Sequence, residues 1–261
     1  DRGRALRGKP EREACSGRSS PWETAGVDDF LDSLARTDPV EISPTLLIVL
    51  VAAAAALSIP QPIWRWFGLF TTLVHELGHA VGAILTGRFV HGMKIRMNHS
   101  GEAVSSGRGK LGAAISGSLG YPAPAIVGAV QLWCVTHGYT ALALVVGGAI
   151  LVLTLLVIRN LVGFLVVAVS AAASVALWLW ATPTQQSYAL LVIAIALLVG
   201  SVRGFAAVLA VHTRGRTRLT SSDAYLLSRR TGIPSIFWLL LFSALIGASV
   251  VWAVTTVLEA Y

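Results

Sequence analysis

Apolar segments follow one another from residue 44 to the end of the chain, separated by short polar breaks. A helix needs about 20 predominantly apolar residues to cross the hydrocarbon core of a membrane. The pattern therefore predicts an all-α polytopic membrane protein with about seven transmembrane helices, six being the alternative. The predicted spans are 45–59, 63–86, 111–136, 139–158, 161–182, 188–212 and 235–257.

Three of these spans leave an alternative open. The segment 45–59 is short, so it is expected to tilt little or to enter the membrane only in part. The segments 139–158 and 161–182 are separated only by Arg159 and Asn160. That break is either a tight turn between two spans or a kink in a single element.

Residues 89–106 have a different pattern. Met93, Ile95 and Met97 alternate with polar residues, which is the period of a half-buried strand, and residues 98–101 (Asn-His-Ser-Gly) are typical of a turn. This predicts a small interfacial β-hairpin after the second span. The hairpin either packs on the helices only, or offers an edge that holds an extended substrate by strand addition.

Residues 1–43 are polar, with seven basic and nine acidic side chains and no apolar run of the signal-peptide kind. Such a segment buries too little apolar surface to order itself, so we predict a disordered, charged N-terminal tail. Residues 44–258 then form the membrane domain.

The composition supports this class. Hydrophobic residues make up 55% of the chain and charged residues 13%, whereas a soluble domain carries about 25% charged residues. The net charge of +7 comes from loops rather than from one soluble face, which argues against nucleic acid as a partner and for the lipid bilayer. Two cysteines, Cys15 and Cys134, make neither a disulfide framework nor a cysteine metal site.

The basic residues also predict an orientation. Residues 87–110 and 213–234 each carry five Lys or Arg residues against one acidic residue, while the alternate connections near 137 and 184 carry none. Basic loops face the cytoplasm. With seven spans, the N-terminus and both basic loops, including the 213–234 loop, are predicted to be cytoplasmic.

The second predicted span contains His75, Glu76 and His79 within the run from Thr71 to Ala83. An H-E-x-x-H sequence on a helix places both histidines on one face, where they can share a zinc ion, with the glutamate as general base for a water. The alternative is a chance match, with the histidines bonded to neighbouring helices and Glu76 paired to an arginine. Each ionisable group is costly inside a membrane, so three of them within five residues favour a metal site over a chance match. We therefore expect one Zn²⁺ per chain.

A catalytic zinc usually has three protein ligands. Among the remaining carboxylates of the membrane domain, Glu102 lies on the predicted hairpin and Asp223 lies on the same side of the membrane as the histidines. Asp223 is the candidate third ligand, although an aspartate opening the run AYLLSRR is equally typical of a helix cap. Asn160 is a second candidate, as an oxygen ligand or an oxyanion donor; its alternative is a turn residue. The other histidines lie on the hairpin (His91, His99), on the outer side (His137) and at a span end (His212).

These features resemble the site-2 protease family of intramembrane zinc metallopeptidases. The similarity covers about residues 63–257 and is greater to a divergent bacterial and plant branch, whose Arg-Asn pair and late Ser-Asp-Ala correspond to Arg159-Asn160 and to residues 222–224. The chain has no Asp-Gly pair, in which the main family carries its third ligand. The resemblance implies cleavage of membrane-anchored protein substrates within or near the bilayer.

The sequence therefore favours an intramembrane zinc metalloprotease in which Glu76 is the catalytic base and His75, His79 and Asp223 bind the metal. The alternative is a non-catalytic metal-binding or partner-binding membrane protein that retains the motif. A transporter is less consistent, because Arg203 is the only other charge deep in a span and no internal repeat is visible.

Overall fold

The structure, a computed structural model, describes residues 26, 28, 30–214, 219, 220 and 222–260. The chain divides into two units, residues 1–35 and residues 36–261. In the first unit, residues 30–33 are helical. Residues 1–25, 27 and 29 lie outside the described residues, so the disorder of the N-terminal tail stays a prediction.

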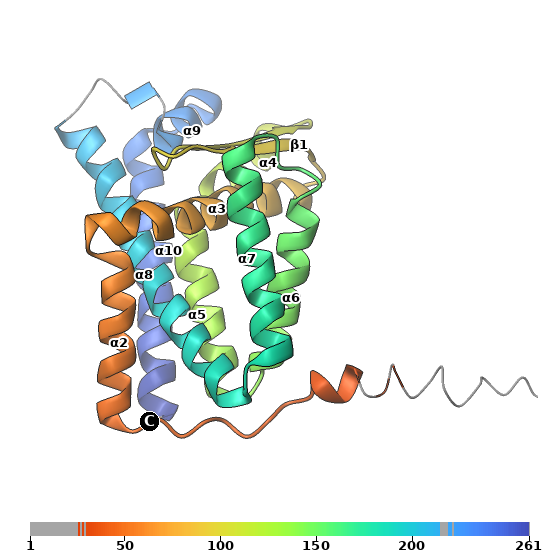
Figure 1. The fold of residues 1–261 in the computed structure, drawn as a ribbon. Helices are drawn as coiled ribbons and strands as arrows, with labels where there is room; N and C mark the ends of the chain where they lie inside the picture. Colours follow the sequence, from red (N-terminus) through yellow and green to blue (C-terminus); the bar gives the residue numbers. More distant parts are fainter. Residues whose placement is uncertain (1–25, 27, 29, 215–218, 221, 261) are drawn as a thin grey trace, which may run out of the picture. The chain divides into compact units, whose positions relative to one another are not determined.

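The second unit consists of helices and one two-stranded antiparallel sheet (Figure 1). Its elements, in chain order, are α2 (Pro44–Ser58), α3 (Gln61–Leu85), β1 (Phe89–Ile95), β2 (Gly101–Ser106), α4 (Lys110–Ser118), α5 (Ala123–Thr136), α6 (Thr140–Thr154), α7 (Leu161–Trp180), α8 (Pro183–Thr213), α9 (Asp223–Thr231) and α10 (Ser235–Ala260). The fold class is thus mostly helical, as the sequence predicts.

Fewer than seven of the described helices meet the length and composition expected of a membrane span. Among the described helices, α3, α7, α8 and α10 are each long and apolar enough to cross a membrane, and α4 with α5 makes a fifth if the bent pair is one span. The helices α2 and α6 have 15 residues each, which is short for a crossing. The structure confirms an apolar helix in each predicted segment, but it does not confirm seven spans.

The segment 111–136 is not one continuous helix, as the sequence analysis expected. It breaks at residues 119–122, and α4 and α5 meet at a bend of 61°. Pro122 has no backbone N–H, and its ring clashes with the preceding turn, which breaks a helix. The bend brings Gly120 and Tyr121 beside His75 on α3.

The predicted hairpin is present. β1 pairs with β2 from Phe89 opposite Ser106 to Ile95 opposite Gly101, with a bulge between Val90 and Gly92. Met93 and Ile95 are fully buried against the helices, as the alternation predicts. Met97 is exposed, because the strand ends at Ile95 and residue 97 belongs to the turn.

The stretch between α6 and α7 lies along the other edge of β1. Met93 N donates to Val157 O (2.8 Å), and Arg159 N donates to Met93 O (2.8 Å). The connection at residues 155–160 is therefore a turn between two helices rather than a kink, and residues 157–159 pair with β1 in the parallel sense.

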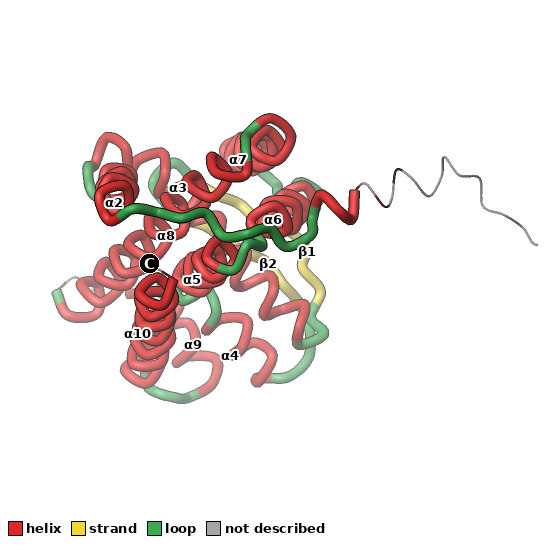
Figure 2. Tube along the Cα trace, turned by 90° about the horizontal axis from the view of Figure 1, so that it is seen from below, coloured by secondary structure: helices red, strands yellow, loops and turns green. Residues whose placement is uncertain are grey.

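The helix α3 is oriented differently from the other long helices. In Figure 1 it runs across the picture in its upper half, whereas α2, α5, α6, α7, α8 and α10 run up and down, and Figure 2 shows several of these from their ends. It packs on α2, α4, α5, α7, α8 and both strands. Gly78 and Gly82 allow this close crossing, because a Cβ at either position would meet the backbone of α4 or the turn after it at 2.8 Å or less.

This arrangement corrects the predicted position of the N-terminal segment. Arg36 Nε donates to His137 O (2.9 Å) and Thr37 N to Gly138 O (3.0 Å), so this segment lies at the α5–α6 connection. The hairpin and α9 lie at the opposite end of the bundle (Figure 1). Residues 36–43 and the basic hairpin thus lie at opposite ends of the bundle, whereas the sequence analysis predicted them on one side of the membrane. The direction of α3, which runs across the bundle, accounts for this difference.

Candidate metal centre

The helix α3 carries the two histidines on one face. It starts at Gln61-Pro62, where proline is tolerated because a first-turn N–H has no partner within the helix, and Gly87 follows its end with φ of 68°. Within α3, His75 and His79 are one turn apart, and their ring centroids are 4.8 Å from each other. Both are largely buried, with 18% and 13% of their side chains exposed.

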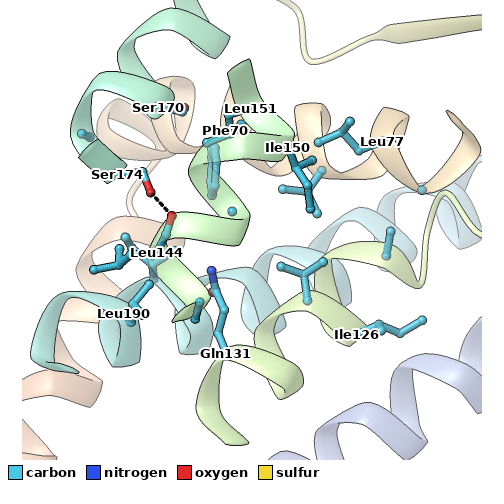
Figure 3. Close-up of a pocket in the computed structure, with 18 of the residues that line it drawn as sticks. Phe70, Leu77, Ile126, Gln131, Leu144, Ile150, Leu151, Ser170, Ser174 and Leu190 are labelled. Carbon is cyan, nitrogen blue, oxygen red and sulfur yellow. Dashed lines mark hydrogen bonds between the residues drawn. The ribbon is translucent and has the colours of Figure 1, made fainter. Parts of the chain in front are cut away.

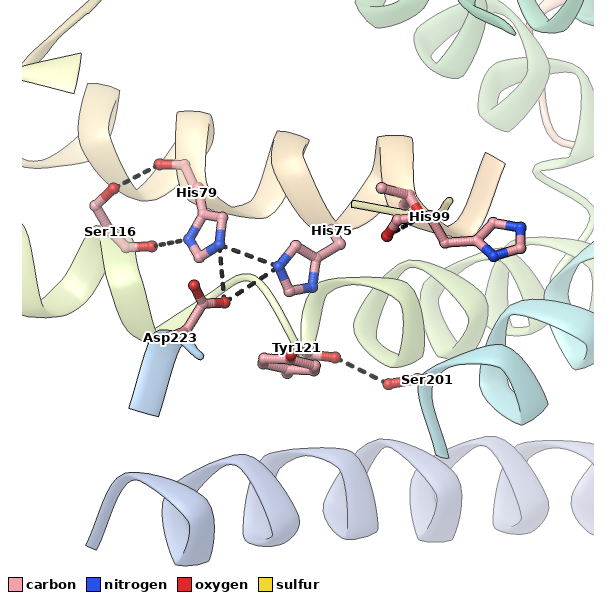
Figure 4. A network of polar contacts seen from close by, with 8 residues as sticks. His75, His79, His99, Ser116, Tyr121, Ser201 and Asp223 are labelled. Carbon is pink, nitrogen blue, oxygen red and sulfur yellow. Dashed lines mark hydrogen bonds and ion pairs between the residues drawn. The ribbon is translucent and has the colours of Figure 1, made fainter. Parts of the chain in front are cut away.

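Asp223 completes a triangle of donor atoms (Figure 4). Its Oδ2 lies 3.2 Å from Nε2 of His75 and 3.2 Å from Nε2 of His79, and the two nitrogens are 3.1 Å apart. Among the described residues, these three form the group of His, Cys, Asp and Glu side chains that could hold a metal ion. The structure thus brings together two residues of α3 and one that follows 144 positions later.

Asp223 is the first residue of α9, so it also has the first-turn position that the sequence allowed as an alternative. Ala224 and Leu227 anchor α9 in a core shared with α4 and α10, which fixes the position of the helix start. Burial raises the pKa of Asp223, but the charge of His79 and hydrogen bonds to both imidazoles outweigh it, so the pKa lies well below its usual value. The carboxylate is therefore ionised, as a metal ligand must be.

A backbone carbonyl orients His79. Its Nδ1 lies 2.8 Å from Ser116 O, and a carbonyl only accepts, so Nδ1 carries the proton. The charge of His79 that acts on Asp223 is a second proton on Nε2, which must leave before a metal binds; the lone pair is then on Nε2, which faces His75 and Asp223. Metal-binding histidines are typically held in this way by a partner for the other ring nitrogen.

The triangle fits zinc. Zinc binds histidine nitrogen at about 2.0–2.1 Å in tetrahedral geometry, which separates neighbouring ligand atoms by about 3.3–3.4 Å. The observed separations of 3.1–3.2 Å are close to this value. Nitrogen lone pairs and a carboxylate oxygen that converge on one point also require a cation or shared protons between them. The donor set of two imidazoles and one carboxylate is one that catalytic zinc sites use.

Glu76 is buried, with 4% of its surface exposed, and takes no part in the triangle. Its carboxylate faces the start of β2, where Gly101 leaves room for it: a Cβ at position 101 would overlap Oε1 of Glu76. Glu76 therefore lies next to His75 in the sequence but outside the group of side chains that could hold a metal ion.

A cavity of about 670 Å³ opens along this face of α3. His75, Glu76 and Asp223 line it together with Tyr121 and the hairpin turn, and α8 forms the opposite wall. Its size falls in the range of about 300–1,000 Å³ that is typical of ligand pockets. The triangle and Glu76 therefore share one cavity.

Comparison with known proteins agrees with this geometry. The family described as Peptidase M50B-like matches residues 47–253. The chain belongs to this family. The resemblance to site-2 proteases is thereby confirmed, and family membership together with the apolar helices makes this an integral membrane protein. Comparisons with curated proteins and with solved structures found no match.

Asn160 of this M50B-like protein lies outside the triangle. Its Nδ2 donates to Ile95 O (2.6 Å), and its Oδ1 accepts from Ile95 N (3.1 Å). Both polar atoms of the amide are therefore occupied by β1. In the structure Asn160 holds the end of the strand, and its role as an oxygen ligand or oxyanion donor stays a prediction.

The other candidates considered for the third ligand also lie outside the triangle. Glu102 is exposed and pairs with Arg96 (3.2 Å), as its predicted solvated role requires. His212 Nε2 lies 2.8 Å from Ser222 Oγ, directly before Asp223. The remaining histidines contact Ser106 (His91), Arg65 O (His99) and Trp133 (His137).

Three residues at this M50B-like centre were missed by sequence reasoning: Ser116, Gly120 and Tyr121. The ring of Tyr121 packs edge-on against His75, with centroids 4.7 Å apart. The signal that could have found Gly120 and Tyr121 is the Gly-Tyr-Pro sequence at 120–122, which interrupts an otherwise continuous apolar run; Ser116 has no such signal.

Proposed function

We propose that this protein is a zinc-dependent intramembrane endopeptidase that cleaves membrane-anchored protein substrates. The observation that carries the proposal is the separation of roles on α3: His75 and His79 form the triangle with Asp223, while Glu76 is buried beside it and bound to none of them. Structural zinc sites have four protein ligands and no need of a separate base. The triangle has three.

His75, His79 and Asp223 would hold one Zn²⁺ per chain. When bound, zinc supplies a Lewis acid that polarises a peptide carbonyl and acidifies water. Glu76 accepts the proton of the attacking water and passes it to the leaving amine, a role worth typically 10²–10⁴-fold in rate. Burial of Glu76 between α3 and β2 keeps its carboxylate in one orientation.

The hairpin offers an edge for an extended substrate. Met93 and Ile95 direct their backbone groups away from β2, toward residues 157–160. Their partners Ala103 and Gly101 therefore direct their own N–H and C=O groups away from β1. This free edge of β2 can add a substrate strand, and it passes directly beside Glu76 at Gly101.

The orientation of the protein is part of the proposal. Residues 87–110 and 213–234 carry the excess of basic residues, so we place the hairpin and the metal centre toward the cytoplasm. Residues 36–43 then lie on the outer side, because they contact the α5–α6 connection at the other end of the bundle.

The test compares wild type with Glu76→Gln and with His75→Ala in cells that also express single-span membrane proteins tagged at both ends. Glu76→Gln is expected to keep about one zinc per chain in the purified protein and to lose cleavage. His75→Ala is expected to lose both. If Glu76→Gln also lost its zinc, Glu76 would be structural, and the non-catalytic metal-binding alternative would be supported.

A further inference from the structure

The long helix α8 ends beside the start of α9, the helix that carries Asp223. α8 has 31 residues and borders two cavities: Leu190 lines an apolar cavity of about 620 Å³ (Figure 3), and Val211 lines the cavity of the metal centre. Fully buried side chains of α8, among them Leu191 and Leu197, pack in two hydrophobic clusters. The helix is therefore held firmly and can support a shorter helix at its end.

Ser222 has the position and the backbone of a helix cap, but it does not cap α9. It precedes Asp223 with φ of −79° and ψ of 134°, and its side chain makes no capping hydrogen bond. Ser43 has a similar backbone before α2 (φ −64°, ψ 152°), and its hydroxyl accepts from Leu46 N at 3.3 Å. Serine is preferred at this position because its oxygen accepts from an N–H of the first turn. The hydroxyl of Ser222 is therefore used differently from that of Ser43.

The hydroxyl of Ser222 is bonded to α8 instead. Its Oγ lies 2.8 Å from Nε2 of His212, the next-to-last residue of α8. Ser222 is only 5% exposed, so the bond is shielded from water. The imidazole and the hydroxyl can each be the donor, so the pair is compatible with every protonation state of His212. Among the described residues, no carbonyl of α8 accepts from this imidazole, so His212 does not cap its own helix.

This bond acts on the residue that directly precedes a proposed ligand. α9 has only nine residues, and Ala224 and Leu227 are buried in the core that it shares with α4 and α10. Leu226 N donates to Ser222 O at 2.9 Å, which makes Ser222 the first acceptor of the helix. Short helices are marginal by themselves, and their ends fray. Loss of the side-chain bond would therefore loosen the first turn, with Asp223 in it, while the core contacts remain.

We propose that His212 is a positioning residue of the metal centre. Through the hydroxyl of Ser222 it holds Asp223 in the position that brings Oδ2 to 3.2 Å from both histidine nitrogens. The inference rests on the proposed role of Asp223 as a metal ligand. It also links a wall of the cavity to the ligand, because α8 forms that wall and is bonded to the residue before Asp223.

The test is a double-mutant cycle on zinc affinity, measured by titration of the purified, metal-stripped full chain. Ser222→Ala and His212→Leu are each expected to weaken zinc binding about tenfold, the lower end of the range for residues that orient metal ligands. The double variant is expected to bind no more weakly than either single one, because both changes break the same bond. His212→Gln, whose amide can donate and accept, and Ser222→Thr should bind zinc as wild type does.

Ser249→Ala is the control for the loss of a buried hydroxyl. Ser249 on α10 is 7% exposed, lies outside the cavity of the metal centre and donates to Leu245 O at 2.9 Å. This variant should bind zinc as wild type does. Hydrogen exchange at the Leu226 amide, followed in the metal-free protein, is a second measurement that does not depend on zinc. It should become faster in Ser222→Ala and in His212→Leu, and stay unchanged in Ser249→Ala.

Losses of affinity that add in the double variant would overturn the proposal, because His212 and Ser222 would then stabilise their helices separately. Unchanged zinc affinity in both single variants would overturn it too, whereas the metal centre would stand if wild type bound zinc. A wild type without zinc affinity would overturn the proposed function and this proposal together. If His212→Leu did not fold, His212→Asn takes its place in the cycle, since its shorter side chain keeps the amide farther from Ser222.

Discussion

Gly120 lies directly beside His75: a Cβ at position 120 would be 2.8 Å from Nε2 of His75 and closer still to Nε2 of His79. The bend between α4 and α5 thus brings a residue without a side chain to the place where the two histidine nitrogens converge. The free space at the metal centre depends on this glycine as much as on the ligands.

Gly120→Ala is therefore expected to weaken zinc binding without removing a ligand. The methyl group would displace one of the two rings, and a displaced ligand costs about tenfold or more in affinity, as changes around a metal site do. Zinc titration of the purified, metal-stripped protein measures it. Gly247→Ala, whose Cβ meets nothing within 4 Å, is the control and should bind zinc as wild type does. Equal affinity in both variants would show that position 120 does not shape the site.

Gly101→Ala separates the base from the metal. Its Cβ would overlap the carboxylate of Glu76, so Glu76 must turn away from its position beside the triangle. The variant should keep its zinc and lose cleavage by about 10²-fold or more, as an enzyme without its general base does. Metal content and cleavage of a tagged single-span substrate are measured together. Loss of zinc in this variant would contradict the separate roles of Glu76 and the triangle.

Asp223→Ala tests the third ligand. Because Asp223 contributes one of three donor atoms, its loss should lower zinc affinity by more than about 100-fold, beyond the range for residues outside the ligand set. Glu102→Ala is the matched carboxylate control: Glu102 is exposed and paired with Arg96, and such pairs contribute little. An Asp223→Ala protein with unchanged zinc affinity would reduce Asp223 to a first-turn residue of α9.

Asn160→Leu tests whether Asn160 holds β1 or serves the reaction directly. The substitution keeps the approximate shape and removes both hydrogen bonds to Ile95, which should destabilise the hairpin by about 1–3 kcal/mol. Hydrogen exchange at the Ile95 amide should rise while zinc binding stays unchanged. Loss of zinc with normal protection of Ile95 would instead restore Asn160 as a ligand.

The orientation is tested by cysteine labelling in a protein that carries Cys15→Ser and Cys134→Ser. Asp38→Cys and Lys94→Cys are both exposed but lie at opposite ends of the bundle. A membrane-impermeant thiol reagent added to intact cells should label Asp38→Cys only, because the basic hairpin loop faces the cytoplasm. Labelling of both residues from outside, or of neither, would contradict the opposite placement of the two ends.

Features with a short period or a short spacing could be predicted from the sequence. The apolar segments, the alternation of Met93 and Ile95 and the spacing of His75, Glu76 and His79 all depend on local geometry, which repeats every two residues in a strand or about every 3.6 in a helix. The candidates for the third ligand could be reduced to a few residues because the membrane domain contains few carboxylates. A choice between them could not be made, because capping and metal binding favour the same residue type at Asp223.

Contacts between distant segments were decided only by the tertiary structure. Packing of α9 on α4 and α10 brings Asp223 to the histidines, and the pairing of residues 157–160 with β1 directs the amide of Asn160 to the backbone of Ile95. The direction of α3 was likewise open, because hydropathy reports only that a segment is apolar and not whether it runs along or across its neighbours. The direction of a helix depends on where it can approach its neighbours closely, as at Gly78 and Gly120. The sequence shows that these residues lack a side chain, but it does not show which element packs against them.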